Sequence, residues 1–293
     1  MVRHFKWPPP RRFKGLSIAI PSSILSVQHH LREKTFVAGI VARAAAIFRI
    51  DTIAIYKDPD SRSEDMKILE LVLRYMREPP YLRKQTIPLT KELRYAGILP
   101  PLATPNHPLI TNKLTKGSIR EALIITKNNK LYADIGLKEL CRLTCNKRKG
   151  KTYIAITELD PLTCKCIDED AVPNYMCYKI ETYDSLTQII NEYRDRKWHI
   201  VISTKKGETI SKIRNELKKV IKRSPGLVII FGSPRYDPDE ILTLEGSRPE
   251  NMLSNCLELN SAPIQGVRSI RTYEALFITL ALINSVLYEE LVL

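Results

Sequence analysis

Two loops that follow apolar segments carry the residue types best suited to bind a small molecule. One begins as Phe231-Gly-Ser-Pro234, directly after the apolar run 227–231, and the other spans Asn260–Thr272 with Gln265-Gly266 inside it. Ligands of open parallel sheets bind beyond the carboxyl ends of the strands. A loop that enters a helix also exposes unpaired N–H groups, which can hold an adenine or a carboxylate. The alternative is that both loops only turn the chain, because Gly and Pro after a strand are common.

A third candidate is the pair Gly39 and Arg43, which lie four residues apart and therefore share one helix face. An arginine within an otherwise apolar helix is costly unless it is paired or lines a site. A guanidinium stays protonated and cannot act as a base, but it can stabilise an anion that develops on a substrate. A buried salt bridge is the alternative for Arg43.

Other well-known binding motifs are missing from the sequence. It contains neither G-x-G-x-x-G nor G-x-x-x-x-G-K-S/T, so an ordinary dinucleotide site or P-loop is unsupported. Its five histidines form no H-x-x-x-H or H-E-x-x-H pattern, and no metal ligands are predicted.

Five of the six cysteines lie close together, at positions 141, 145, 164, 166 and 177. Their spacing is not that of a zinc knuckle. Buried thiols are the favoured interpretation, with disulfides and a zinc site as the alternatives.

Positive charge is concentrated in two segments. The chain has 46 Lys and Arg against 32 Asp and Glu, a net charge of +14. Residues 1–15 carry five basic and no acidic residues, and residues 101–151 carry eleven basic and three acidic ones. Clustered charge of this kind favours a polyanionic partner. The predicted contacts to it are Arg11, Arg12, Lys147, Arg148, Lys149 and Lys151.

The ends of the chain suggest neither export nor membrane insertion. The N-terminus has no apolar stretch before Pro8-Pro9-Pro10, so it is not expected to be a signal peptide. The most apolar segment, 275–287, contains polar residues and is expected to be a buried helix rather than a membrane span. A soluble, cytoplasmic protein is the expectation.

The elements that must position these residues alternate between strand and helix. Apolar strand patterns occur at 16–20, 52–56, 199–203, 227–231 and 256–260. Helical patterns occur at 36–50, 64–76, 185–196, 209–223 and 272–289. Such alternation predicts an α/β fold with a parallel sheet covered on both faces.

The middle of the chain has a different pattern. Short strand-like runs at 122–126, 131–135, 153–157 and 163–167 are separated by turn residues such as Asn128-Asn129. They predict a small all-β barrel or sandwich. The organisation that follows is an α/β domain built from residues 1–100 and 180–293, interrupted by a β domain at 101–179.

Together the three motifs resemble those of the SPOUT (SpoU–TrmD) class of RNA methyltransferases. Gly39-x-x-x-Arg43 is similar to the first motif of the class, and Phe231-Gly-Ser-Pro234 with Glu240-Ile241 to the second. Asn260, Gln265-Gly266 and Arg271-Thr272 resemble the third. The nearest likeness is to the archaeal and eukaryotic subfamily that carries an inserted oligonucleotide-binding (OB) barrel.

The resemblance implies a deep trefoil knot near the C-terminus, S-adenosylmethionine as cofactor, and a homodimer with its site near the interface. It implies an enzyme that methylates rRNA or tRNA, on a base rather than on the ribose. Arg43 would be catalytic, and helices 36–50 and 272–289 would form the dimer surface. The alternative is a non-catalytic RNA-binding or ribosome-assembly factor with the same fold. The implied cofactor residues are Phe231, Gly232, Ser233, Pro234, Leu259, Asn260, Gln265, Gly266, Val267, Ile270 and Thr272.

Overall fold

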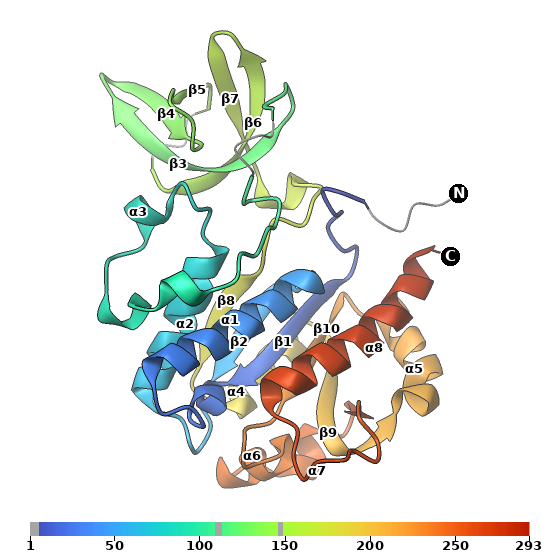
Figure 1. Ribbon diagram of the computed structural model, residues 1–293. Coiled ribbons are helices and arrows are strands. Elements are labelled where there is room, and N and C mark those ends of the chain that lie inside the picture. Colours follow the sequence, from blue (N-terminus) through green and yellow to red (C-terminus); the bar gives the residue numbers. More distant parts are fainter. Residues whose placement is uncertain (1–5, 109–112, 146–148, 293) are drawn as a thin grey trace. The chain divides into compact units, whose positions relative to one another are not determined.

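The computed structural model describes residues 6–108, 113–145 and 149–292 (Figure 1). These residues form two compact units. The barrel unit takes in the described parts of residues 1–11, 75–89 and 101–177, and the sheet unit residues 12–74, 90–100 and 178–293. The predicted insertion 101–179 therefore corresponds to most of the barrel unit, which also includes a second short segment and the N-terminal tail.

The sheet unit is built on six parallel strands in the order β11-β9-β10-β1-β2-β8. The central strands are buried along their whole length because they consist almost entirely of apolar residues, as expected for a sheet covered on both faces. The strands are β1 (Gly15–Pro21), β2 (Thr52–Tyr56), β8 (Lys179–Tyr183), β9 (His199–Thr209), β10 (Gly226–Phe231) and β11 (Leu257–Asn260).

Helices cover both faces of this sheet, which confirms the predicted α/β architecture. On one face α8 packs against α1, α5 and β10, and on the other α4 packs against β9 and α6. Figure 1 shows α1 and α8 lying across the same face. The helices of this unit are α1 (Leu31–Ile47), α4 (Leu186–Asp195), α5 (Ile210–Arg223), α6 (Pro238–Leu244), α7 (Pro249–Met252) and α8 (Thr272–Val292).

Two strands of this sheet differ from the prediction. β8 was not predicted because Lys179-Ile-Glu-Thr-Tyr183 alternates charged and apolar residues, which suits an edge strand with one wet face. β9 continues to Thr209 rather than ending at Ser203, and its polar second half looks like a loop in the sequence. Predicted and observed bounds of the other strands of this sheet agree within a few residues.

The barrel unit contains a closed five-stranded barrel, in the order β3-β4-β5-β7-β6. Neighbouring strands are antiparallel except β5 and β7, which pair in parallel. Asn128 and Asn129 both have positive φ, as the two-residue turn between β3 and β4 requires. The strands are β3 (Ile119–Lys127), β4 (Lys130–Asp134), β5 (Cys141–Leu143), β6 (Lys151–Leu159) and β7 (Leu162–Ile167).

The remaining helices are short or connect the two sets of strands. They are α2 (Ser63–Arg77), α3 (Arg83–Thr86) and single 3-10 turns at Ser22–Leu25, Lys91–Leu93, Ala96–Ile98 and Glu169–Ala171. Within the described residues, no helix is both long and apolar enough to cross a membrane.

The cysteines of the barrel are paired, so the favoured prediction of buried thiols was wrong for four of them. Disulfides join Cys141 to Cys164 and Cys145 to Cys166. The parallel pairing of β5 with β7 brings Leu143 opposite Cys164, which sets both pairs of Cα atoms about 6 Å apart. Cys177 and Cys256 take part in neither disulfide.

Candidate functional site

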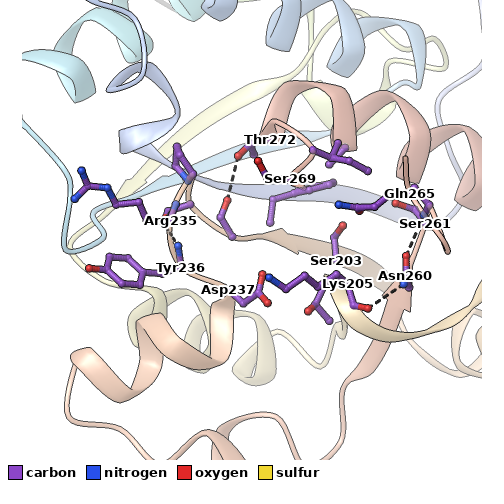
Figure 2. Close-up of a pocket in the computed structure, with 18 of the residues that line it drawn as sticks. Ser203, Lys205, Arg235, Tyr236, Asp237, Asn260, Ser261, Gln265, Ser269 and Thr272 are labelled. Atoms are coloured by element: carbon purple, nitrogen blue, oxygen red, sulfur yellow. Dashed lines mark hydrogen bonds between the residues drawn. The ribbon is translucent and has the colours of Figure 1, made fainter. Parts of the chain in front are cut away.

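A cavity of about 440 Å³ lies at the carboxyl ends of β9, β10 and β11, closed on one side by the start of α8 (Figure 2). Three segments meet there: residues 203–205 of β9, the loop after β10, and the loop between β11 and α8. Its size falls in the usual range for small-molecule sites, and its place at the strand ends is where parallel sheets bind ligands.

The polar half of β9 forms one wall of the cavity. The pairing of β11 with β9 moves from Glu258 opposite Ile202 directly to Leu259 opposite Glu208, so residues 203–207 bulge out of the ladder. Gly207 allows this, because a Cβ there would lie 2.6 Å from the backbone carbon of Glu258. This wall was not predicted, because Gly207 within a polar run indicates an irregular strand but not the register that makes residues 203–205 face the cavity.

Asn260 ties this bulge to the opposite loop. Its amide nitrogen donates to the carbonyl oxygen of Lys205 at 2.9 Å, and its amide oxygen accepts from the N–H of Ala262 at 3.1 Å (Figure 2). The Asn260 side chain, predicted to contact a cofactor, thus also fixes the backbone of two walls of the cavity, the β9 bulge and the loop after β11.

The loop after β10 turns back sharply at Gly232. A Cβ at this position would lie 2.7 Å from the carbonyl oxygen of Tyr236, so the turn itself requires glycine. The Ser233 hydroxyl accepts from the N–H of Tyr236 at 3.0 Å, and the Ser233 N–H donates to the Tyr236 carbonyl at 2.9 Å. The loop is therefore held in shape by its own hydrogen bonds.

The first turn of α8 closes the cavity. The Thr272 hydroxyl donates to the carbonyl of Gly232 at 3.2 Å, which joins the helix start to the loop after β10 (Figure 2). Ile270, Thr272 and Ala275 line the cavity. The N-terminus of a 21-residue helix carries partial positive charge and unpaired N–H groups, and favours an anionic group of a ligand.

Eight of the eleven predicted cofactor residues line the cavity: Phe231, Gly232, Ser233, Pro234, Asn260, Gln265, Ile270 and Thr272. Leu259, Gly266 and Val267 are not among the lining residues. Leu259 is buried in the core, so only its backbone could contact a ligand, whereas Val267 is 59% exposed.

Charges of both signs surround the cavity. Lys205, Arg235 and Arg268 are basic lining residues, and Asp237 and Glu240 are acidic ones. Figure 2 shows the Lys205 side chain extending toward the Asp237 carboxylate.

The Asp237 carboxylate is the least satisfied of these groups. Its Oδ2 atom is buried and accepts no hydrogen bond from the described residues, although the Lys206 ammonium lies 3.8 Å from it. Burial raises the pKa of Asp237 above its usual value, against the opposing effect of nearby lysines. Such an atom is ready to accept a hydrogen bond from a cationic ligand group.

Arg43 does not line this cavity. It lies in α1, which runs against the strand direction and starts near the carboxyl edge of the sheet. Twelve residues separate it from the start of α1, or about 18 Å along the helix axis. Its half-buried side chain therefore lies apart from the cavity walls of its own chain.

The two predicted contacts in the N-terminal tail have different surroundings. Arg12 is only 8% exposed and donates to the Phe48 carbonyl and to the Asn284 Oδ1 atom, each at 2.8 Å. It links the end of α1 to α8, which indicates a structural role rather than RNA contact. Arg11 is more exposed, donates to the Glu169 carbonyl at 3.0 Å and lies 3.6 Å from the Asp170 carboxylate.

Lys151 is committed to a buried ion network. Its ammonium lies 2.5 Å from Glu78 and 3.1 Å from Glu121, and Arg77 also contacts Glu121 at 3.1 Å. Glu78 and Glu121 are each less than 5% exposed, so both are shielded from solvent. Of the other predicted contacts in this segment, Lys149 is exposed, and Lys147 and Arg148 lie outside the described residues.

Comparison with known proteins gives a family match over nearly the whole chain. The sequence model of the family described as "Putative RNA methyltransferase" matches residues 15–283. That interval includes every element that lines the cavity.

Individual relatives have low sequence identity to this chain, but the similarity extends over most of its length. An uncharacterized protein of Haloarcula marismortui is 27% identical over 282 residues, covering 90% of this chain and 96% of its own length. The 28S rRNA (uridine-N(3))-methyltransferase of Drosophila melanogaster is 27% identical, over 94% of this chain and 63% of the fly protein. Its human counterpart is 25% identical, over 91% of this chain and 77% of the human protein.

Proposed function

We propose that this chain, which belongs to the family of RNA methyltransferases whose model it matches, methylates N3 of a uridine in ribosomal RNA with S-adenosylmethionine as the donor. The enzyme class follows from the family. The base and the atom are proposed from relatives named as uridine-N(3) methyltransferases. The observation that carries the proposal for the donor is the cavity at the strand ends, which combines a helix N-terminus with charges of both signs.

The residues of the cavity fit a donor whose methionine part carries both an ammonium and a carboxylate group. The buried Oδ2 of Asp237, which accepts no hydrogen bond from the described residues, would accept one from the ammonium group, and Glu240 adds negative charge. Lys205, Arg268 and the N-terminus of α8 would receive the carboxylate. Backbone groups of Gly232 and Gln265 would hold the adenosine portion, as the resemblance of their loops implies.

When bound, S-adenosylmethionine would supply an electrophilic methyl group on its sulfonium, with the neutral thioether S-adenosylhomocysteine as the leaving group and the uridine N3 proton released to solvent. The protein's part is to hold donor and acceptor in line and to exclude water. The loops can do this because the Thr272–Gly232 and Asn260–Lys205 hydrogen bonds fix their backbones before any ligand binds.

We propose a catalytic role for Arg43 in the cavity of a second copy of the chain. Arg43 cannot take the uridine proton, because guanidinium remains protonated. It can stabilise the negative charge on the uracil oxygens as the N3 proton leaves. Since the cavity of its own chain does not include it, a homodimer through α1 and α8 would have to bring it there. The exposed apolar side chains of Phe36, Ile47 and Ile278 on these helices support such a surface.

Two structural features that the resemblance implies also stand as proposals: the deep trefoil knot and the OB character of the barrel. A cytoplasmic location, expected from the sequence, stands as a proposal as well. The hydrogen bond from the start of α8 back to the loop after β10, with β9 lying between β10 and β11, supports a C-terminal segment that crosses another loop. The parallel pair β5–β7 in an otherwise antiparallel five-stranded barrel supports the OB assignment.

The test is methyl transfer to ribosomal RNA from a strain that lacks this protein. Purified protein, labelled S-adenosylmethionine and this RNA should yield N3-methyluridine at one site, detected by nucleoside mass spectrometry. Asp237→Asn should weaken donor binding in calorimetry roughly tenfold or more, the scale of one charge-assisted hydrogen bond. Methyl groups on another atom would overturn the N3 assignment, and absence of donor binding would overturn the cavity assignment.

A further inference from the structure

The barrel unit carries a second concave surface, which the proposed chemistry does not use. This groove has a volume of about 950 Å³. It is lined by Trp7 and Pro8 and by residues from the segments 103–108, 113–120 and 173–176. We call it the Trp7 groove.

The indole at one side of the groove is exposed and yet anchored. Trp7 is 53% exposed, which is unusual for a tryptophan. The chain that follows it pairs with residues 173–175: the N–H of Tyr175 donates to the Pro9 carbonyl at 3.0 Å, and that of Arg11 to the Pro173 carbonyl at 2.8 Å. Three consecutive prolines stiffen the same stretch. The backbone that follows Trp7 is therefore held in place, which lowers the entropic cost of ordering this stretch when a ligand binds.

The groove is positively charged. Lys113, Lys116 and Arg120 line it, and none of its described lining residues is acidic. The contact of Lys116 with Glu158 at 2.6 Å joins two largely exposed side chains, so it holds the lysine only weakly. Arg120 donates to the Ile135 carbonyl at 3.0 Å through one of its five N–H groups, which leaves donors for another partner.

We propose that the Trp7 groove binds a single-stranded segment of RNA, with one base stacked on the indole of Trp7 and the adjoining phosphates on Lys113, Lys116 and Arg120. An aromatic face beside several cations is the arrangement that binds unpaired nucleotides. A duplex would offer phosphates but hide its base faces. The proposal rests on the proposed function, which supplies RNA as the partner, and it places an RNA site outside the basic run 147–151.

Stacking can be tested by fluorescence, because the protein has only two tryptophans. Oligouridine of about ten nucleotides, the scale of one such site, is titrated into the full-length protein without methyl donor. Binding should quench part of the emission of the wild type and none in Trp7→Phe, where only Trp198 remains. Trp7→Ala should weaken binding about tenfold or more, as loss of one stacked base does. Unchanged quenching in Trp7→Phe would overturn the stacking assignment.

Charge is tested with a matched pair of double variants. Lys113→Ala/Lys116→Ala removes two cations from the groove, and Lys127→Ala/Lys130→Ala removes two exposed cations from the β3–β4 hairpin of the same unit. The first should lower the slope of log affinity against log salt by about 1.4, at 0.7 per phosphate contact on a single strand. The second should leave the slope unchanged. Equal slopes in the two double variants would overturn the groove as the phosphate-binding surface.

Two further measurements separate this proposal from the proposed function. Duplex RNA of the same length should compete poorly, and equal competition would overturn single-strand binding. A wild type that binds oligouridine through Trp7 but transfers no methyl group would leave the groove intact and refute the enzymatic proposal. Groove variants that bind and methylate ribosomal RNA like the wild type would refute the groove alone.

Discussion

Lysines that are neighbours in the sequence have different physical roles in this protein. Lys149 is exposed, whereas Lys151, two residues later, lies between Glu78 and Glu121 in the barrel unit. Both belong to one basic run, and the sequence therefore predicts that both contact an anionic partner. Their surroundings separate them, because Lys151 and Arg77 together already balance the charges of two buried carboxylates.

Replacing Lys151 by Ala should therefore destabilise the protein without weakening its affinity for RNA. Removing one member of a buried ion network leaves uncompensated charge and costs about 3–5 kcal/mol. Denaturant unfolding measures the loss, and the salt dependence of RNA binding should match the wild type. Lys149→Ala is the control, with wild-type stability. If Lys151→Ala instead folded normally and bound RNA with a smaller salt slope, Lys151 would be an RNA contact after all.

His107 makes the barrel unit sensitive to acid. Burial lowers the pKa of His107 to about 4, opposed by the hydrogen bond of its Nε2 atom to the Arg77 carbonyl. The unfolded chain, with a pKa near 6.5, takes up this proton first. The contribution of neutral His107 to stability is thus complete above pH 6.5 and is lost as the pH falls toward 4. By pH 4.5 the loss should reach about 2.5 kcal/mol.

The check compares unfolding free energies of the wild type and His107→Gln at pH 7.5 and pH 4.5. Glutamine can keep the donor but cannot be protonated, so the stability difference between the two proteins should change by about 2.5 kcal/mol over this interval. Carboxylates titrate equally in both and cancel. A difference that stays constant would show that His107 titrates alike in the folded and unfolded chains.

At the scale of elements, the sequence predicted what depends on apolar periodicity and missed what depends on contacts between distant segments. β10 and β1 are continuous apolar runs and could be placed within a residue or two. β8 was not predicted because an edge strand needs only one apolar face. β5 was not predicted because three residues are too few to show the alternation of a strand. The bulge of β9 depends on how β11 pairs with it, and no pattern within residues 203–207 reveals that register.

The candidate site followed the same rule. Loops with Gly at strand ends could be found from residue types, and eight of their predicted residues do line the cavity. The contribution of β9 and the exposure of Trp7 could not be predicted from residue types, because both depend on contacts with segments far away in the sequence. The cysteine pairs likewise depend on the parallel register of β5 and β7.

The two disulfides are expected to contribute to the stability of the barrel. Each closes a loop of just over twenty residues, for which chain-entropy arguments give about 3 kcal/mol. Protein purified without reductant and then denatured should react with thiol reagent at two cysteines, Cys177 and Cys256. After reduction all six should react, and the folded protein should unfold at lower denaturant. Six reactive thiols before reduction would refute the pairing, and Cys256→Ser should lower each count by one.

At the scale of the whole molecule, the proposed homodimer makes a prediction that a monomeric enzyme would not. If Arg43 serves the cavity of the second copy, Arg43→Ala and Gly232→Val chains should each be inactive alone but complement each other when refolded together. A mixed dimer then has one intact site, so activity should return to as much as about one quarter of the wild type, since half of the dimers are mixed. Methyl transfer measures it. Absence of any recovery would place Arg43 outside the partner's reaction.

Residues 6–11 belong to the barrel unit, although Arg12 already belongs to the sheet unit. An affinity tag attached before Met1 would therefore begin only six residues from the indole of the Trp7 groove. Proteolytic trimming before Pro9 would remove that indole and leave the sequence of the donor cavity untouched. Preparations that differ only in their tag or in trimming of this tail can be expected to agree on donor affinity and to disagree on RNA affinity.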